Sequence, residues 1–173
     1  MENGFMNTSG RDPQILEKQE QALRFDAFTQ TNAICLGKQM IASSEKMGIP
    51  FAIIIELNGI RVVQYVPEGT GAFHLLWMES KLYTVKTFGK STMRIWAENE
   101  QRGMKRQGGP NSDMPCLVCC GGGFPIWVNG VGLVGQIAVS GPGDAAEHDF
   151  IADSLKSFQS NIRMNRQSNN VSD

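Results

Sequence analysis

The stretch "PFAIIIELNGIRVVQYV" (Pro50–Val66) decides the fold, because two runs rich in β-branched residues flank Asn58-Gly59. Asn-Gly supplies the positive φ angles of a two-residue type I′ turn, so we expect a β-hairpin here. A second stretch, "FPIWVNGVGLVGQIAVS" (Phe124–Ser140), repeats the pattern around Asn129-Gly130. Tight turns join antiparallel strands and cannot join parallel ones. The two hairpins therefore predict an antiparallel sheet.

Segments with helical spacing lie before, between and after the hairpins. We expect a helix from Asp12, as N-cap, and a second one from Thr29, which caps it, to Gly48. Two more helices are expected over residues 73–88 and 91–103, and a last one begins at Asp144 as cap and ends near residue 162. The run "MPCLVCC" (114–120) reads as a further strand. The predicted order is α-α-β-β-α-α-β-β-β-α, an α+β domain with helices packed on one sheet, of profilin-like or PAS-like shape.

Length and charge place limits on the class of protein. The 173 residues predict a single domain over residues 12–162, with a disordered N-terminus (1–11) and a frayed tail (163–173). Sixteen basic and seventeen acidic residues nearly cancel, so we expect no nucleic-acid partner. No apolar run approaches the roughly 20 residues of a membrane span, and no secretory signal is visible. The expected location is cytoplasmic, with the four cysteines as free thiols.

Two glycine motifs resemble nucleotide-binding sequences. Gly130, Gly132 and Gly135 form a G-x-G-x-x-G, but they lie in the expected hairpin instead of between a strand and a helix, which indicates a structural role. The stretch "FGKST" (88–92) lacks the first glycine of a P-loop, since Thr84 stands at that position. Neither motif therefore predicts a nucleotide site.

Three of the cysteines cluster at the end of the expected third strand. Cys116 and Cys119 form a C-x-x-C, but residues three apart on a strand point to opposite faces, so a core role is favoured over redox or zinc chemistry. Cys120 directly precedes Gly121 and Gly122. It is either a buried thiol beside a bulge or the wall of a pocket whose backbone amides face a ligand.

Lys81 interrupts an apolar row on its helix, because it shares a face with Trp77 and Phe88. It either snorkels to the helix edge or offers a cation in a sheltered cleft that suits a ligand carboxylate. Ser140 and Gly141 lie between a strand and a helix start, where free amides favour an anion.

His148 lies one turn into the last expected helix, between two acidic residues. Such a histidine is usually solvated or structural. Its near-neutral pKa still makes it the best general acid or base that the sequence offers.

The segment from Gly121 to Leu155 resembles the C-terminal signature of the haem-degrading domain superfamily, which includes HbpS-like proteins, GlcG-like proteins and the C-terminal domain of PduO. Within it, the likeness is greatest to an uncharacterised bacterial and fungal branch. Further matches are "FT…A…LG" at residues 28–37, "P-x-A-I-x-I-x-L-NG" at residues 50–59 and "W-x-x-x-K-x-x-x-V-K-x-F" at residues 77–88. The resemblance covers about residues 14–160.

The resemblance implies a five-stranded antiparallel sheet, homo-oligomers built from dimers, and binding of haem or iron as described in relatives. The positions that match the signature are Trp77, Lys81, Gly121, Gly122, Phe124, Pro125, Ser140, Gly141 and His148. The chain departs from the branch at Cys120, where histidine is usual. Thiolate is also an axial ligand of haem iron, so Cys120 can take that role.

Two functions follow from these observations. The first is a homo-oligomeric module that binds a small molecule or cofactor, with haem as the cofactor considered. The second is a non-catalytic assembly protein without a bound cofactor. No nucleophile and base stand at a recognisable spacing, so enzymatic activity is left open. The predicted ligand-binding residues are Trp77, Lys81, Cys120, Gly121, Gly122, Ser140, Gly141 and His148.

Overall fold

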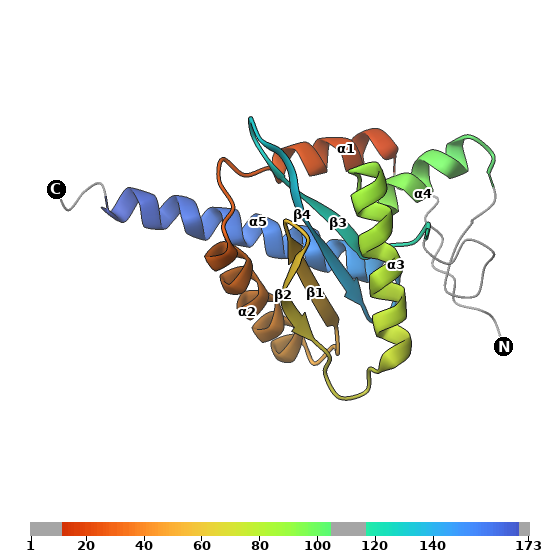
Figure 1. Cartoon of the computed structure of the whole chain (residues 1–173), viewed down its shortest axis with the longest axis horizontal. Helices are drawn as coiled ribbons and strands as arrows, with labels where there is room; N and C mark the ends of the chain where they lie inside the picture. Colours follow the sequence, from red (N-terminus) through yellow and green to blue (C-terminus); the bar gives the residue numbers. More distant parts are fainter. Residues whose placement is uncertain (1–11, 105–116, 170–173) are drawn as a thin grey trace.

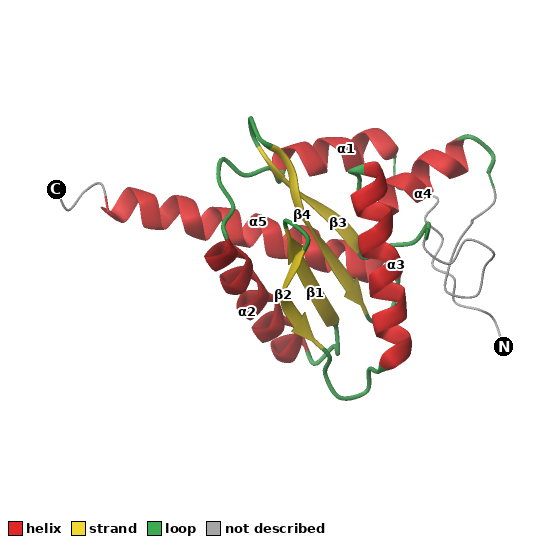
Figure 2. Ribbon diagram, in the orientation of Figure 1, coloured by secondary structure: helices red, strands yellow, loops and turns green. Residues whose placement is uncertain are grey.

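The computed structural model describes residues 12–104 and 117–169, and there the chain forms one antiparallel sheet with helices on both faces (Figures 1 and 2). The α+β class is therefore confirmed. The elements, in chain order, are α1 (Pro13–Ala22), α2 (Gln30–Met47), β1 (Ala52–Leu57), β2 (Ile60–Tyr65), α3 (Ala72–Phe88), α4 (Thr92–Gln101), β3 (Gly123–Val128), β4 (Gly132–Ser140) and α5 (Asp144–Asn169).

The sheet of the described residues has four strands in the order β2-β1-β4-β3, so the prediction of five strands was wrong. Cys116 lies outside the described residues, and residues 117–120 belong to none of the four strands. The backbone amide of Val118 donates to Thr84 Oγ1 on α3 at 2.9 Å. A helix hydroxyl, and not a neighbouring strand, thus satisfies this amide. The predicted order had one β element too many.

Both predicted hairpins are confirmed. Asn58 and Gly59 have φ angles of 51° and 78°, as a type I′ turn requires, and connect β1 to β2. The second turn is longer, since Asn129, Gly130 and Val131 lie between the end of β3 and the start of β4. Within it, Val131 N donates to Val128 O at 3.1 Å and Gly130 has a φ of 73°.

Helix caps explain where most of the helices begin. Asp12 accepts a hydrogen bond from Gln14 N at 2.8 Å, and Thr29 Oγ1 accepts one from Asn32 N at 3.2 Å, so both predicted N-caps are present. Asp144 differs from its prediction. It is the first residue of α5, and its carboxylate accepts a hydrogen bond from Gly121 N at 3.0 Å. The helix then continues past residue 162 to Asn169.

Alternate residues of β1 face two separate cores. Ile53 and Ile55 pack into the larger core, which α2 and α5 cover. Ala52 and Ile54 face the opposite side, where they meet Met78 and Leu82 of α3. Period-two alternation thus places α3 against one face of the sheet, and this arrangement lets α3 reach the end of β4.

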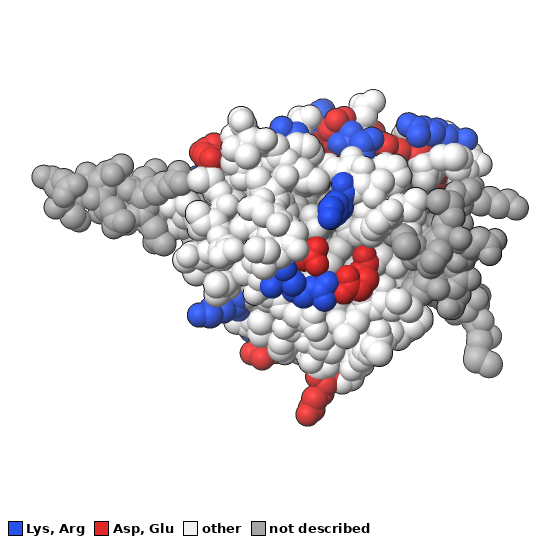
Figure 3. All heavy atoms as spheres, viewed as in Figure 1, with Lys and Arg blue, Asp and Glu red and all other residues white. Residues whose placement is uncertain are grey.

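In the view of Figure 3, charged side chains gather in a small mixed cluster near the centre and in a mixed band over α1 and α4, and others lie singly elsewhere on the surface. Most of the surface over α3 in this view is uncharged. In the described part of the chain, no helix combines the length and apolar character that a membrane span needs.

Candidate functional site

A cleft of about 200 Å³ lies where the N-terminal half of α3 meets the end of β4 and the first turn of α5. We name it the α3–α5 cleft. Helix α3 contributes Phe73, His74, Trp77 and Lys81. The remaining lining residues are Cys120, Ser140, Gly141, Asp144 and Glu147.

A buried ion pair forms the floor of the α3–α5 cleft. Lys81 Nζ lies 2.6 Å from Glu147 Oε2, and the two side chains are only 3% and 6% exposed. The ammonium also donates to Val139 O at 2.7 Å, while Glu147 Oε1 accepts from Gly141 N at 2.8 Å. A buried charge is tolerated only when it is paired, and here each partner has a second hydrogen bond. The pair therefore ties α3 to the end of β4 and to α5.

This geometry decides between the two interpretations of Lys81. The side chain does not snorkel into solvent, because it is buried. Nor is its charge kept for a ligand, because the protein's own Glu147 neutralises it. With Asp144 also in the wall, the lining side chains carry more acidic than basic groups. The cleft is therefore not built to attract an anion through Lys81.

The glycines after Cys120 allow close packing instead of exposing amides. A side chain on Gly122, whose φ is +90°, would place its Cβ 2.6 Å from Glu147 Oε2 and 2.8 Å from Lys81 Nζ. A Cβ on Gly121 would overlap the carbonyl of Asp144. The amide of Gly121 is already donated to Asp144 Oδ1. These positions thus need glycine so that the backbone can lie directly against the ion pair and α5.

The mouth of the cleft is aromatic. The Phe73 and Trp77 rings meet edge to face with centroids 6.2 Å apart, and Phe73 is largely exposed. His74 Nδ1 accepts a hydrogen bond from Gly71 N at 3.2 Å, so in the neutral ring the proton sits on Nε2. Cys120 lies in the wall, almost fully buried. Flat apolar ligands stack on such rings, and the Cys120 sulfur is a soft metal ligand in the wall of the cleft.

Most of the predicted site residues come together at this cleft, namely Trp77, Lys81, Cys120, Ser140 and Gly141, with Gly121 and Gly122 packed behind the ion pair. His148 does not join them. Its ring is fully buried, its Nε2 lies 2.8 Å from Gln19 Oε1 of α1, and its centroid lies 5.7 Å from that of Phe124. It therefore packs between α5, α1 and β3, away from the cleft.

Sequence reasoning missed Glu147, His74 and Phe73 as lining residues. For Glu147 a signal existed, because a lysine in an apolar row that is not at a helix edge requires a carboxylate. For His74 and Phe73 no motif marks their position. Within the described residues, no group of three or more His, Cys, Asp or Glu side chains is placed to hold a metal ion.

Comparisons with known proteins agree on one relationship. The family model described as haem degrading protein HbpS-like matches residues 28–156. A UPF0303 protein of Mesorhizobium japonicum is 31% identical over 144 residues, which cover 83% of this chain and 86% of that protein. A UPF0303 protein of Streptomyces coelicolor is 27% identical over 155 residues, with 88% and 98% covered.

Solved structures share the fold. The crystal structure of the Ybr137w protein has a TM-score of 0.77 at 22% identity, covering 88% of this chain and 90% of that one. The PduOC:Heme complex has a TM-score of 0.62 at 18% identity, covering 76% and 94%. A double mutant of Streptomyces reticuli HbpS has a TM-score of 0.59 at 20% identity, covering 75% and 85%.

Proposed function

The chain belongs to the family of haem degrading proteins described as HbpS-like, and from this membership we propose that the α3–α5 cleft binds a small molecule or cofactor, with haem as the candidate. The observation that carries the proposal is the thiol of Cys120 in the wall of a cleft whose mouth is formed by the Phe73 and Trp77 rings. Thiolate ligates haem iron in some haem proteins, and aromatic rings stack on flat macrocycles.

Of the two side chains in the cleft that commonly serve as axial ligands of haem iron, Cys120 and His74, the geometry favours Cys120. A histidine that ligates a metal usually donates its other ring N–H to an acceptor. His74 has the opposite arrangement, because its Nδ1 accepts from a backbone amide, and this leaves a proton on Nε2 of the neutral ring. Cys120 would therefore hold the iron. Bound haem would supply redox-active iron at this position.

The volume of the cleft indicates how the ligand is held. Pockets that enclose drug-sized ligands measure about 300–1,000 Å³, whereas this cleft measures about 200 Å³. A bound macrocycle would therefore be only partly enclosed, and Phe73 and Trp77 at the mouth would contact the part left outside. The buried Lys81–Glu147 pair below fixes the positions of α3 and α5 relative to each other.

A haemin titration followed through the Soret band tests this proposal. We expect the wild-type band to shift and saturate, and Cys120→Ala to remove the shifted band, while His74→Gln retains it. Phe73→Ala weakens binding about tenfold, in line with about 1.4 kcal/mol for an aromatic contact. Phe88→Ala is the matched control, because Phe88 is an exposed aromatic at the other end of the same helix. A wild-type spectrum identical to free haemin refutes the haem proposal.

A second candidate function, self-assembly, is favoured by the outer face of α3. Four of its large apolar side chains are about half exposed. They are Phe73, Leu76, Tyr83 and Phe88. We expect native mass spectrometry to show a homo-oligomer that Leu76→Glu dissociates. A monomer at micromolar concentration would end this proposal.

A further inference from the structure

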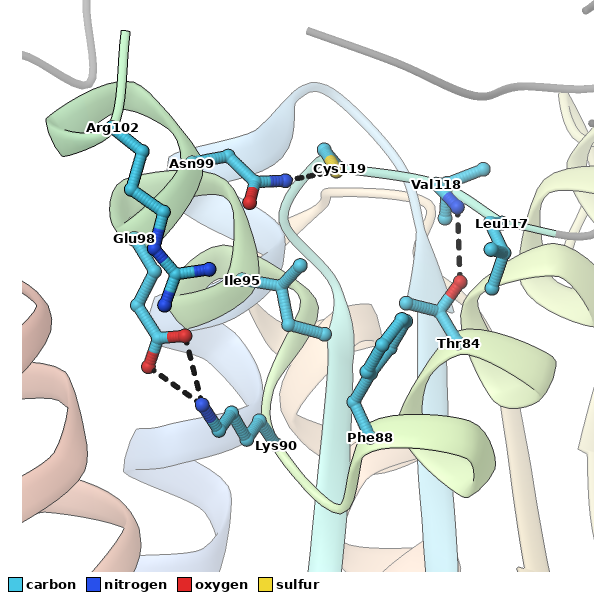
Figure 4. Close-up of a pocket in the computed structure, with 10 residues that line it drawn as sticks. All are labelled: Thr84, Phe88, Lys90, Ile95, Glu98, Asn99, Arg102, Leu117, Val118 and Cys119. Carbon is cyan, nitrogen blue, oxygen red and sulfur yellow. Dashed lines mark hydrogen bonds and ion pairs between the residues drawn. The ribbon is translucent and has the colours of Figure 1, made fainter. Parts of the chain in front are cut away.

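A second cavity, distinct from the α3–α5 cleft, lies between the C-terminal half of α3 and α4 (Figure 4). We name it the α3–α4 cavity. Its volume is about 250 Å³, and the short segment Leu117–Cys119 forms its third side. The adjacent residues Cys119 and Cys120 line different sites, since Cys119 faces this cavity and Cys120 faces the cleft.

Two hydrogen bonds tie the segment Leu117–Cys119, the third side of the cavity, to α3 and to α4. Val118 N donates to Thr84 Oγ1 of α3 at 2.9 Å, and Asn99 Nδ2 of α4 lies 3.3 Å from Cys119 Sγ. Both bonds are visible in Figure 4. Because the segment is tied to both helices, it can neither fall into the space nor swing away without breaking these bonds. These bonds therefore position the segment against both helices.

The interior of the cavity is apolar. Figure 4 shows the Phe88, Ile95 and Leu117 side chains around one common space. Filling that space with hydrocarbon would remove the exposed parts of Phe88 and Leu117 from water against the already buried Ile95, and the gain grows with each methylene group buried. The body of a fitting ligand is therefore aliphatic or aromatic.

The charges at the rim favour an anion. The Glu98 carboxylate accepts both of its bonds to Lys90, at 2.8 and 2.9 Å, and a third from Arg94 Nε at 2.9 Å. Burial alone would raise the pKa of Glu98, but the bonds and charges of Lys90 and Arg94 outweigh burial and hold it below its ordinary value. Glu98 is thus ionised and fully engaged at neutral pH.

Arg102 adds a cation that this network does not use. Its side chain also lines the cavity, and Figure 4 shows the guanidinium pointing back along α4 between Glu98 and Ile95. Among residues 12–104 and 117–169, no carboxylate forms an ion pair with it. The lining side chains therefore carry two cations, Lys90 and Arg102, against one carboxylate.

We propose that the α3–α4 cavity binds a small organic acid with an apolar body, whose chain packs on Phe88, Ile95 and Leu117 and whose carboxylate pairs with Arg102. A guanidinium binds a carboxylate through two parallel hydrogen bonds, which gives both charge and orientation. The site does not depend on haem binding, because none of its residues lines the α3–α5 cleft.

Isothermal titration calorimetry of the full chain with three probes tests the proposal. Octanoate carries both the apolar body and the charge, octanol has the body alone, and acetate has the charge alone. We expect octanoate to bind at least tenfold more tightly than either of the other probes. Equal affinity for octanoate and octanol would overturn the role of Arg102, and equal affinity for octanoate and acetate would overturn the apolar body.

Substitutions then locate the site. Arg102→Gln should weaken octanoate binding about tenfold, which corresponds to about 1.4 kcal/mol, and leave octanol binding unchanged. Phe88→Asp should abolish octanoate binding, because it places a like charge in the cavity. Tyr83→Asp is the matched control on the same helix, since Tyr83 is 51% exposed against 48% for Phe88 and does not line the cavity.

The Tyr83→Asp control also distinguishes ligand binding in the α3–α4 cavity from an indirect effect of self-assembly. Both aspartates lie on the outer face of α3, so an effect through dissociation of an oligomer would be common to the two variants. Equal loss of octanoate binding in both, or retention in both, refutes the α3–α4 cavity as the site. Thermal unfolding of each variant verifies that it is folded.

Discussion

Replacing Lys81 by methionine tests the ion pair on which the α3–α5 cleft depends. Methionine keeps the length and most of the volume of lysine, but it leaves the Glu147 carboxylate buried with Gly141 N as its remaining donor among the described residues. Removing one partner of a buried pair costs about 3–5 kcal/mol, because the other charge stays buried without compensation. In a protein of this size, 1 kcal/mol shifts the unfolding temperature by about 2–4 °C.

We therefore expect Lys81→Met to lower the unfolding temperature by about 6–20 °C. Circular dichroism during heating and urea unfolding measure this change. Arg61→Met is the matched control, since the Arg61 side chain is 32% exposed and its partners Glu79 and Glu56 are 50% and 19% exposed, against 3% and 6% for Lys81 and Glu147. Exposed pairs contribute roughly 0–1 kcal/mol, so the control should change little.

The double variant of Lys81→Met and Glu147→Gln distinguishes a coupled pair from two separate effects. If the charges stabilise each other, removing both should cost about 2 kcal/mol less than the sum of the single changes. Additive losses, or a cost below about 1 kcal/mol for Lys81→Met alone, would refute the reasoning.

Three further predictions concern packing and pH. Gly122→Ala should destabilise the fold by about 2 kcal/mol or more in urea unfolding, because the new Cβ meets the ion pair. Gly59→Ala is the control: its Cβ meets nothing within 4 Å, so it should cost about 1 kcal/mol from its positive φ alone. Equal costs for the two variants would contradict the crowding at Gly122. The ionised Glu98 carboxylate should contribute its full share of the free energy of unfolding above the ordinary glutamate pKa of 4.5, and this share is lost as the pH falls through the lower pKa of the folded state. Wild-type protein should therefore lose more stability on acidification than Glu98→Gln. Parallel profiles of stability against pH for the two proteins would contradict the bonds to Lys90 and Arg94. His148→Leu should lower the unfolding temperature without changing a haemin titration, because the ring is buried away from the cleft. A folded variant that no longer shifts the Soret band would show that His148 takes part in haem binding.

Local chemistry explains what the sequence predicted well. Asn58-Gly59 needs only its own φ preferences to form a turn, and Asp12 and Thr29 need only amides two or three residues away to cap their helices. These features depend on near neighbours in the chain. The resemblance to the haem-degrading superfamily is also confirmed, because its motifs are stretches of contiguous sequence.

Other features depend on long-range contacts, and for that reason the sequence did not predict them. Lys81 and Glu147 lie 66 positions apart, and although a lysine in an apolar row indicates that it needs a carboxylate, the sequence does not indicate which one. His148 directly follows Glu147, yet one step of about 100° around a helix turns it toward Gln19 instead of the cleft. The run 114–120 is apolar enough for a strand, but an apolar run does not reveal that a helix hydroxyl takes the amide of Val118.

A crystal structure of the chain grown with haemin, with anomalous data at the iron edge, tests the central claim most directly. The cleft between α3 and α5 predicts one iron peak within bonding distance of the Cys120 sulfur, with the macrocycle against Phe73 and Trp77. An iron peak elsewhere on the molecule, or an empty cleft in crystals of protein that shifts the Soret band, would contradict it.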